Sequence, residues 1–476
     1  MVIKTFCMNR IKQILYSNLL LFIMYSPNMF CQGVPILRLK QAVDSTIKNY
    51  PGLQAKQMYV KSGEKLVVDA KHQQLPSLKL HDQGDIGTDN SLPGSYFPMG
   101  IVPSSSGGIR TDNNRDAASG NLGVVYSEYD LFTFGLNRTR VESAKALENT
   151  ADADYKKTEY WLEYRVTQLY FDVLKYNLLA SIQQKNITRY DVLYMYIKAY
   201  TASGLKAGVD SSVADAEVSK AKIQLIQTTE RLNQLKSDLV FYMGIKNIDF
   251  NVDTTLYHLS SSSVNQLQAL VSGDSVSLTN PILNYYKSRW DYSLTQEKLI
   301  KKSYLPKLSL VGAGWTRGSS ISSKDVYGNL STGIDFTRYN YMAGVAFTYN
   351  IIDVLHRKDK MGIYYYQSEA VKQELAEQKS LLSNQLNQSD IAVKASLDKI
   401  KEIPVLLKAS RDAYAQKLAQ YNSGLINIVD LTNVSYLLYT AETDEVEARS
   451  ELLNTLLQKA VTNNTLGTPI FRLINA

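Results

Sequence analysis

The sequence has little of what a catalytic, metal-binding or disulfide-stabilised protein requires. Its 476 residues include two cysteines, Cys7 and Cys31, which excludes a disulfide framework. The four histidines are scattered without the spacing of a metal site, and the sequence has no nucleophile elbow and no phosphate-binding loop. We therefore predict no enzymatic activity, no cofactor and no bound metal.

Long apolar runs are also missing after the first 31 residues. Those residues carry three basic side chains, then an apolar run from Ile14 to Met24, then polar sequence. This order is typical of a secretory signal peptide. The apolar run is too short to cross a bilayer comfortably, and no run of about 18 apolar residues occurs later. We predict a signal peptide over residues 1–31 and no transmembrane helix in the mature chain.

The end of the predicted signal peptide leaves two alternatives open. Cys31 lies where the lipid-carrying first residue of a lipoprotein would lie, which makes it a candidate for lipidation. The residues from Asn28 to Phe30, however, lack the small side chains that such sites favour. Cleavage near Gln32 without lipidation is therefore the second interpretation.

Strong charge of either sign is absent as well. The chain has 52 basic and 45 acidic residues, and loss of the three basic residues in positions 1–31 lowers its net charge from +7 to +4. Such a mild charge argues against a nucleic-acid partner. With 45% hydrophobic and 20% charged residues, the chain has the composition of a folded protein.

What the sequence does contain is an internal duplication. The motif Ser203-Gly204-Leu205 recurs as Ser423-Gly424-Leu425, and Val209-Asp210 recurs at the same offset as Val429-Asp430. Residues 51–80 align in a similar way on residues 281–310. Self-similarity over such a distance indicates two copies of one structural unit. We expect a first repeat over 32–245, a linker over 246–279, a second repeat over 280–467 and a tail over 468–476.

Each repeat is expected to run from a helix through two strands to a long helical hairpin. Pro76 and Pro306 cannot continue a helix, so the chain should change there from helix to strand. The strand segments alternate apolar residues such as Leu78, Leu80 and Phe347 with small or polar ones. Glycine, serine and charged residues fill the segments between them, which is typical of solvated loops.

The long segments have a different period. From Leu162 to Ile197, apolar and aromatic residues follow one another at alternating steps of four and three, which is a heptad seam. Similar seams run through Val218–Tyr242 and Leu431–Leu452. A helix from about Gly135 to Ser203 would reach about 100 Å at 1.5 Å per residue. The core packing of ordinary antiparallel coiled coils explains these seams as well as a functional role of the long helices does. The function therefore has to be inferred from the strands.

Four strands per chain leave sheet edges exposed, and the smallest closed membrane barrels need about eight strands. In lipid, alternating strands can satisfy their backbone groups only in a closed barrel. Three chains would supply twelve strands. The alternative is a small soluble β-layer that caps a coiled coil. We predict a mainly α fold with duplicated long helical hairpins and a small β part that contributes to a trimeric twelve-strand barrel.

At this point a family resemblance becomes specific. Several short motifs carry it. Near the helix starts these are the residues from Leu39 to Val43 and the pair Tyr50-Pro51, which recurs in the second repeat as Asn280-Pro281. The others are the two Leu-Pro pairs before the strands, the segment from Asp130 to Gly135, and the two turn motifs. In this order the layout resembles the TolC family of outer-membrane efflux proteins over nearly the whole mature chain. Each motif is weak singly, but their order, spacing and duplication together are specific.

The resemblance implies a homotrimeric duct in the outer membrane with a large periplasmic portion. It also implies contact with outer-membrane lipid, a periplasmic adaptor protein and an inner-membrane transporter driven by protons or ATP. In that family the two hairpin turns form the periplasmic tip where adaptors dock. Gly204 and Gly424 would reverse the chain there in the left-handed conformation that glycine accepts, and Leu205 and Leu425 would contact the adaptor.

The resemblance further assigns residues to the tunnel entrance. Asp430 matches an aspartate ring at the constriction, and Asn433 stands where the family has a second aspartate. Tyr421, Ile426 and Asp210 match a tyrosine, an arginine and an aspartate that hold the entrance shut. Because Ile426 cannot form a salt bridge, we expect a Tyr421 to Asp210 hydrogen bond without the ionic lock. A plainer role for Asp210 and Asp430 is to favour the start of the returning helix through its free N–H groups and dipole.

Two other functions compete with a passive exit duct. A structural or adhesive coiled-coil surface protein would have no pore, and paired strands at matching places in both repeats argue against it. An unaided diffusion porin is disfavoured because porins do not need helices of about 100 Å.

Overall fold

The structure is a computed structural model that describes residues 35–91, 109–204, 207–246, 249–258 and 279–466. The predicted signal peptide 1–31, which includes Cys31, and the predicted tail 468–476 lie outside these described residues. Leu205 and most of the predicted linker 246–279 lie outside them as well.

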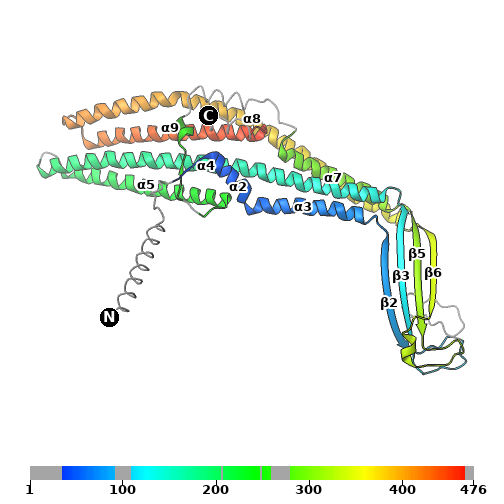
Figure 1. The fold of residues 1–476 in the computed structure, drawn as a ribbon. Helices are drawn as coiled ribbons and strands as arrows, with labels where there is room; N and C mark the ends of the chain where they lie inside the picture. The colour runs from blue at the N-terminus through cyan, green and yellow to red at the C-terminus, as the bar shows by residue number, and fades with distance from the viewer. Residues whose placement is uncertain (1–34, 92–108, 205–206, 247–248, 259–278, 467–476) are drawn as a thin grey trace, which may run out of the picture.

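Two hairpins of long helices form most of the molecule. The first hairpin consists of α4 (Leu136–Ala202) and α5 (Gly208–Met243), and the second of α8 (Asp353–Asn422) and α9 (Ile428–Thr462). With 67 and 70 residues, α4 and α8 each reach about 100 Å. The hairpins lie side by side with their turns at the same end of the molecule (Figure 1).

Shorter helices continue toward the other end. These are α2 (Leu39–Asn49), α3 (Pro51–His72) and α7 (Pro281–Ser303). Both α3 and α7 start with proline, whose missing N–H costs nothing in the first helical turn. The side chain of Asn280 caps α7 by accepting a hydrogen bond from the N–H of Ile282 at 2.9 Å. Both helices pack against α4 and lead toward the strands (Figure 1).

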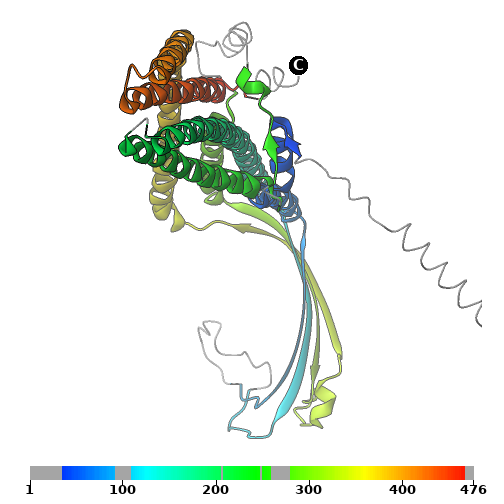
Figure 2. The same ribbon diagram turned by 90° about the vertical axis from the view of Figure 1, so that its left-hand side faces the viewer.

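Four long strands form one antiparallel sheet in the order β2-β3-β5-β6. They are β2 (Ser77–Gly87), β3 (Ala118–Phe132), β5 (Lys307–Ser319) and β6 (Arg338–Thr348). As predicted from the two prolines, β2 and β5 begin directly after Pro76 and Pro306. The sheet turns away from the helices, and its strands curve together (Figures 1 and 2). Within the described ranges, β2 and β6 each have an edge without a partner strand.

A second, very small sheet lies near the middle of the helices. Here β1 (Ile36–Leu37) pairs in parallel with β4 (Asn251–Val252), and a short 3₁₀ helix, η1 (Thr255–His258), follows. The fully buried Tyr170 of α4 ties both strands to the helix. Its hydroxyl donates to the Leu37 carbonyl at 2.8 Å and accepts from the Asp253 N–H at 3.0 Å. The described part of the linker therefore closes over the start of the first repeat.

The buried apolar side chains form two main clusters along the helices. The first, here called the central cluster, includes Leu169, Val173 and Leu174 of α4 together with Leu452 and Leu456 of α9. The second, here called the tip cluster, lies near the hairpin turns. It consists of Ile187, Tyr190, Leu193, Ile197, Ala214, Val218, Ala221, Tyr421, Ile428 and Leu431. The predicted heptad seams thus supply most of the core.

The predicted fold class is confirmed. The described chain is mainly helical, with duplicated long hairpins and two long strands in each repeat. None of its described helices contains a stretch that is both long enough and apolar enough to span a membrane.

The role of Tyr170 generates a test of this packing. In a Tyr170→Phe variant, the Leu37 carbonyl and the Asp253 N–H each lose a hydrogen bond to the hydroxyl and keep the 3.3 Å hydrogen bond between them. We expect the free energy of unfolding to fall by about 1 kcal/mol. Thermal unfolding in detergent measures the change, with Tyr59→Phe on the exposed face of α3 as the control. Equal melting temperatures for the two variants would contradict this role.

Candidate functional site

The two hairpin turns are built on glycines with a left-handed backbone. Gly204 has φ +74° and Gly424 has φ +76°, and no atom of the described residues beyond the adjoining ones lies within 4 Å of the position that a Cβ would occupy at either glycine. The backbone angle, and not lack of space, therefore requires glycine. In the second turn the Leu425 N–H donates to the Gln420 carbonyl at 2.9 Å, which closes the end of α8. The predicted turn geometry is present in both repeats.

The returning helices start differently in the two repeats. In the second, Asn427 is the N-cap, and its side chain accepts a hydrogen bond from the Asp430 N–H at 2.9 Å. In the first, the N-cap is Ala207, which offers no side-chain acceptor. Asp210 and Asp430 both lie in the first turn of their helices. Their negative charge there interacts favourably with the helix dipole and stabilises the helix. The side-chain cap of the second returning helix is therefore Asn427 and not Asp430.

Tyr421 lies deep between the two hairpins. Its side chain is 1% exposed and belongs to the tip cluster. Burial raises its pKa to about 12, and the negative charge of Asp210 and the proximity of Tyr196 act in the same direction. The phenol therefore stays protonated at neutral pH. The structure thus brings Tyr421 of the second hairpin and Asp210 of the first close enough to interact.

Ile426 lies partly buried against the same cluster. Its apolar side chain extends the contact between the second turn and the hairpin core. An isoleucine at this position therefore contributes to packing between hairpins, which is a role that a charged side chain would not fill.

The remaining residues predicted for the entrance face solvent. Asp430 and Asn433 are exposed on α9, one turn apart. Leu425 is 75% exposed in the second turn, whereas its counterpart Leu205 lies outside the described residues. The predicted site therefore divides in two: Tyr421, Ile426 and Asp210 lie at the contact between hairpins, and Leu425, Asp430 and Asn433 lie on the surface.

At the other end of the molecule, the strand register separates the sheet into two chemically different faces. Leu80 pairs with Val125, Val125 with Gly314 and Gly314 with Tyr341, so these positions share one face. We call it the apolar sheet face. Its large exposed side chains are Leu78, Leu80, Ile86, Val125, Tyr129, Leu310, Tyr339, Tyr341, Val345 and Phe347.

The opposite face carries polar and charged groups. Lys307 lies 2.8 Å from Glu128 and 3.6 Å from Asp130, and the hydroxyl of Ser309 donates to Asp130 at 2.6 Å. These groups join β3 to β5 across one face only. A sheet that exposes apolar side chains on one face and ion pairs on the other is suited to separate lipid from water.

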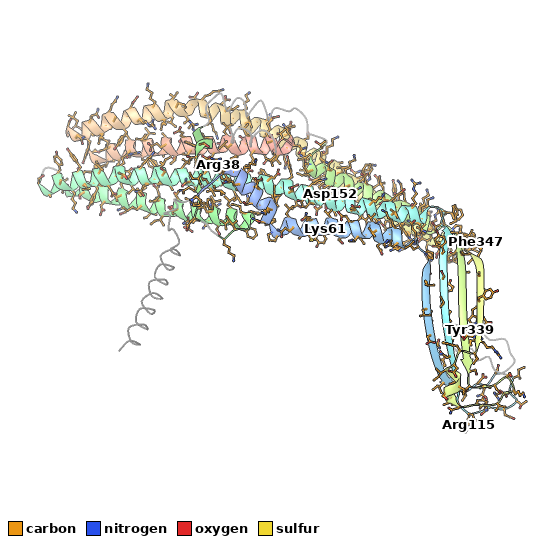
Figure 3. All side chains as sticks on the ribbon, viewed as in Figure 1. Arg38, Lys61, Arg115, Asp152, Tyr339 and Phe347 are labelled. Carbon is orange, nitrogen blue, oxygen red and sulfur yellow. The ribbon has the colours of Figure 1, made fainter. Side chains whose placement is uncertain are left out.

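Aromatic residues mark both ends of the apolar sheet face. Phe347 lies beside the helices and Tyr339 lies toward the far end of the same strand (Figure 3). They are eight residues apart on the same face, which at about 3.4 Å per residue gives about 27 Å along the strand. This separation is comparable to the height of about 25 Å of the apolar band between the aromatic girdles of membrane barrels.

No metal centre is found in the described part of the chain. Among these residues, no group of three or more histidine, cysteine, aspartate or glutamate side chains is arranged to hold a metal ion.

The comparisons with known proteins agree on one family and one fold. A family model described as outer membrane efflux protein matches residues 42–244 and 279–458. No curated protein matches the chain. Among solved structures, the outer membrane channel CmeC of Campylobacter jejuni is 13% identical with a TM-score of 0.72, and the match covers 90% of this chain and 85% of that one.

Two further solved structures are similar over most of their length. The outer membrane protein VceC of Vibrio cholerae is 13% identical with a TM-score of 0.69, covering 90% of this chain and 96% of that one. The open state of the outer membrane channel MtrE of Neisseria gonorrhoeae is 14% identical with a TM-score of 0.66, covering 90% of this chain and 89% of that one. At these identities, the likeness shows the fold.

The turn geometry predicts that, of two glycine substitutions, only the one at a left-handed residue destabilises the protein. Gly424→Ala places a Cβ on a left-handed residue, so we expect the free energy of unfolding to fall by about 1–2 kcal/mol. Gly208→Ala lies in the first turn of α5 without a positive φ and with open space around it. It should be neutral or stabilise by up to about 1 kcal/mol. Thermal melts of the two variants test this, and a shared direction of change would contradict it.

Proposed function

Because this chain belongs to the outer membrane efflux protein family, as the resemblance to TolC predicted, we propose that three copies of it form an exit duct. The family places it in the outer membrane with a large periplasmic part, and the family is one of channels and not of enzymes. The finer statements that follow, on the trimer, the partners and the entrance, are supported by the geometry of the sheet and of the hairpin turns.

The observation that carries the proposal is the four-stranded sheet with two open edges and one apolar face. The unpaired edges of β2 and β6 carry backbone N–H and C=O groups that lipid cannot satisfy. Pairing β6 of one chain with β2 of the next keeps the strands antiparallel. Three chains then close a barrel of twelve strands, with the apolar sheet face toward lipid and the Lys307 ion pairs toward the lumen.

The two repeats contribute equally to this duct. In the proposed organisation, residues 1–31 are removed as a signal peptide, and residues 32–245 and 280–467 each supply two strands and one long hairpin. Residues 246–279 link the repeats around the middle of the tunnel, where the described part forms β4 and η1. Cys31 is the candidate for lipidation at the start of the mature chain.

The hairpin turns are the proposed docking points for the partners. Gly204 with Leu205, and Gly424 with Leu425, would form the periplasmic tip that meets an adaptor protein. The 75% exposure of Leu425 supports this contact, since an apolar side chain at an exposed tip is suited to be covered by a partner. An inner-membrane transporter, driven by protons or by ATP, would supply the energy through that adaptor.

The tunnel entrance is proposed to be lined by α9. Three copies of Asp430 around one axis would form a ring of negative charge that sets the preference for cations, and Asn433 one turn above it would add no charge. Tyr421 and Asp210 would form the hydrogen bond between hairpins. Ile426 would hold the turn by apolar contact where the resembling family has an arginine.

The direct test of the duct is a planar-bilayer recording of the purified full-length protein. We expect discrete single-channel steps. A coiled-coil surface protein without a pore would leave the bilayer silent, and this result would contradict the proposal.

The proposed ring gives a sharper prediction. Asp430→Asn removes three charges from one narrow opening, so we expect the concentration of a trivalent cation that half-blocks the channel to rise by about tenfold. Blocking titrations in planar bilayers measure it.

Asp215→Asn is the matched control, because Asp215 is an exposed aspartate near the tip on α5 of the other hairpin. Unchanged block in Asp430→Asn would remove Asp430 from the lining of the pore. An equal loss of block in both variants would assign the effect to general surface charge.

A further inference from the structure

On α4, a buried polar layer separates the central cluster from the tip cluster. In the second hairpin, a third and smaller apolar cluster of Leu407, Leu438 and Ala441 lies beside the residues that face this layer. On α4, the central cluster ends at Leu174 and the tip cluster begins at Ile187. The only fully buried α4 residues between them are Gln183 and Asn186, which are 4% and 2% exposed. The apolar seam of the first hairpin is therefore interrupted by amides about 27 Å from its turn, counting the residues from Asn186 to Gly204 at 1.5 Å each.

An ion pair joins the two hairpins at this layer. Arg189 of α4 lies 2.8 Å from Glu442 of α9, and their side chains are only 16% and 18% exposed. The guanidinium also lies over the ring of Tyr414 of α8, 5.6 Å from its centre. One arginine of the first hairpin thus contacts both helices of the second, from about 22 Å above the turn at Gly204.

Further polar contacts cross the same layer. Gln183 donates a hydrogen bond to the hydroxyl of Tyr439 on α9. The amide oxygens of Gln183 and Asn186 and one guanidinium nitrogen of Arg189 are buried without a hydrogen-bond partner among the described residues. Buried polar atoms of this kind normally bind ordered water. The layer is therefore suited to hold water between two dry apolar clusters.

We propose that the two hairpins begin to separate at this polar layer when the tip opens, and that the Arg189–Glu442 pair, on the tip side of the layer, is the lock that keeps them together. The proposal rests on the proposed function, in which the tip must open for cargo to enter. Opening on the tip side exposes part of the apolar tip cluster to water. The polar groups of the layer can be hydrated at small cost, so the separation can stop there and leave the central cluster packed. The lock would act in place of the ion pair that Ile426 cannot make at the turn.

A partly buried ion pair resists separation because a lone buried charge is costly. Removing one partner leaves the other desolvated and uncompensated, which favours any arrangement that returns it to water. The opened arrangement does this for Arg189. Loss of Glu442 should therefore shift the channel toward its open state as well as lower its stability.

The test uses the full-length protein in planar bilayers. We expect Glu442→Gln to raise the fraction of time in the high-conductance level by about tenfold or more. The charge-reversed pair Arg189→Glu with Glu442→Arg should return it toward the wild-type value. Arg189→Met with Glu442→Leu, which continues the apolar seam through the layer, should show no rise.

The chain offers a matched control on the same two helices. Lys175 of α4 lies 3.6 Å from Glu447 of α9, on the central side of the polar layer, and Glu447 is 58% exposed. Glu447→Gln should leave conductance unchanged because this ion pair is longer than Arg189–Glu442 and both of its side chains, with Lys175 at 25%, are more exposed. If Glu442→Gln does not assemble, Arg189→Lys replaces it. This variant keeps the charge but loses the planar guanidinium, and it should give a smaller rise.

Each outcome decides between a lock and a purely structural pair. A lower melting temperature with wild-type conductance in Glu442→Gln or Arg189→Lys would overturn the lock. So would equal rises in Glu442→Gln and Glu447→Gln, or a reversed pair that restores nothing. Absence of channels in the wild-type protein would instead overturn the proposed function, and the lock with it.

Discussion

The unpaired edges of one four-stranded sheet constrain the rest of this molecule. A curved sheet with an apolar outer face cannot end in lipid, because its edge N–H and C=O groups would have no partner. The four strands of this sheet in the described part of the chain are too few to close on themselves, so the proposed closure requires neighbouring chains in a fixed register. That register in turn fixes how the helices that leave the sheet at Pro76 and Pro306 are arranged around the same axis.

In the proposed duct, the helices have a different role, which is to extend the tunnel far from the membrane. Heptad seams let α4 pair with α5 and α8 with α9 over great length, and the two hairpins contact each other through the central and tip clusters. Between these clusters lies the polar layer around Gln183, Asn186 and Arg189. The contact between the hairpins is thus apolar at its middle and near its tip, with buried polar groups of α4 between.

Much of this could be predicted from sequence because the signals are local or repeated. The positions of Pro76 and Pro306 predicted the changes from helix to strand, and the alternation of apolar with small or polar residues predicted the faces of the sheet. Gly204 and Gly424 predicted the hairpin turns. Asn427 could also have been found, since an asparagine three residues before Asp430 at the start of a helix is a common N-cap. The Arg189–Glu442 pair could not be found, because 253 residues separate its partners along the chain and nothing local specifies which helices meet. The pairing of β1 with β4 was missed for the same reason.

The central claim is that β2 of one chain pairs with β6 of another, and cysteine cross-linking tests it most directly. A cysteine at Gly344 of β6 is combined in turn with one at each position from 77 to 83 of β2. Because β2 and β6 do not pair within one described chain, an added disulfide must join different chains. The account predicts covalent dimers and trimers at the β2 positions in register, and none in a parent without the added cysteines. Monomers alone at every position, in variants that remain folded, would contradict it.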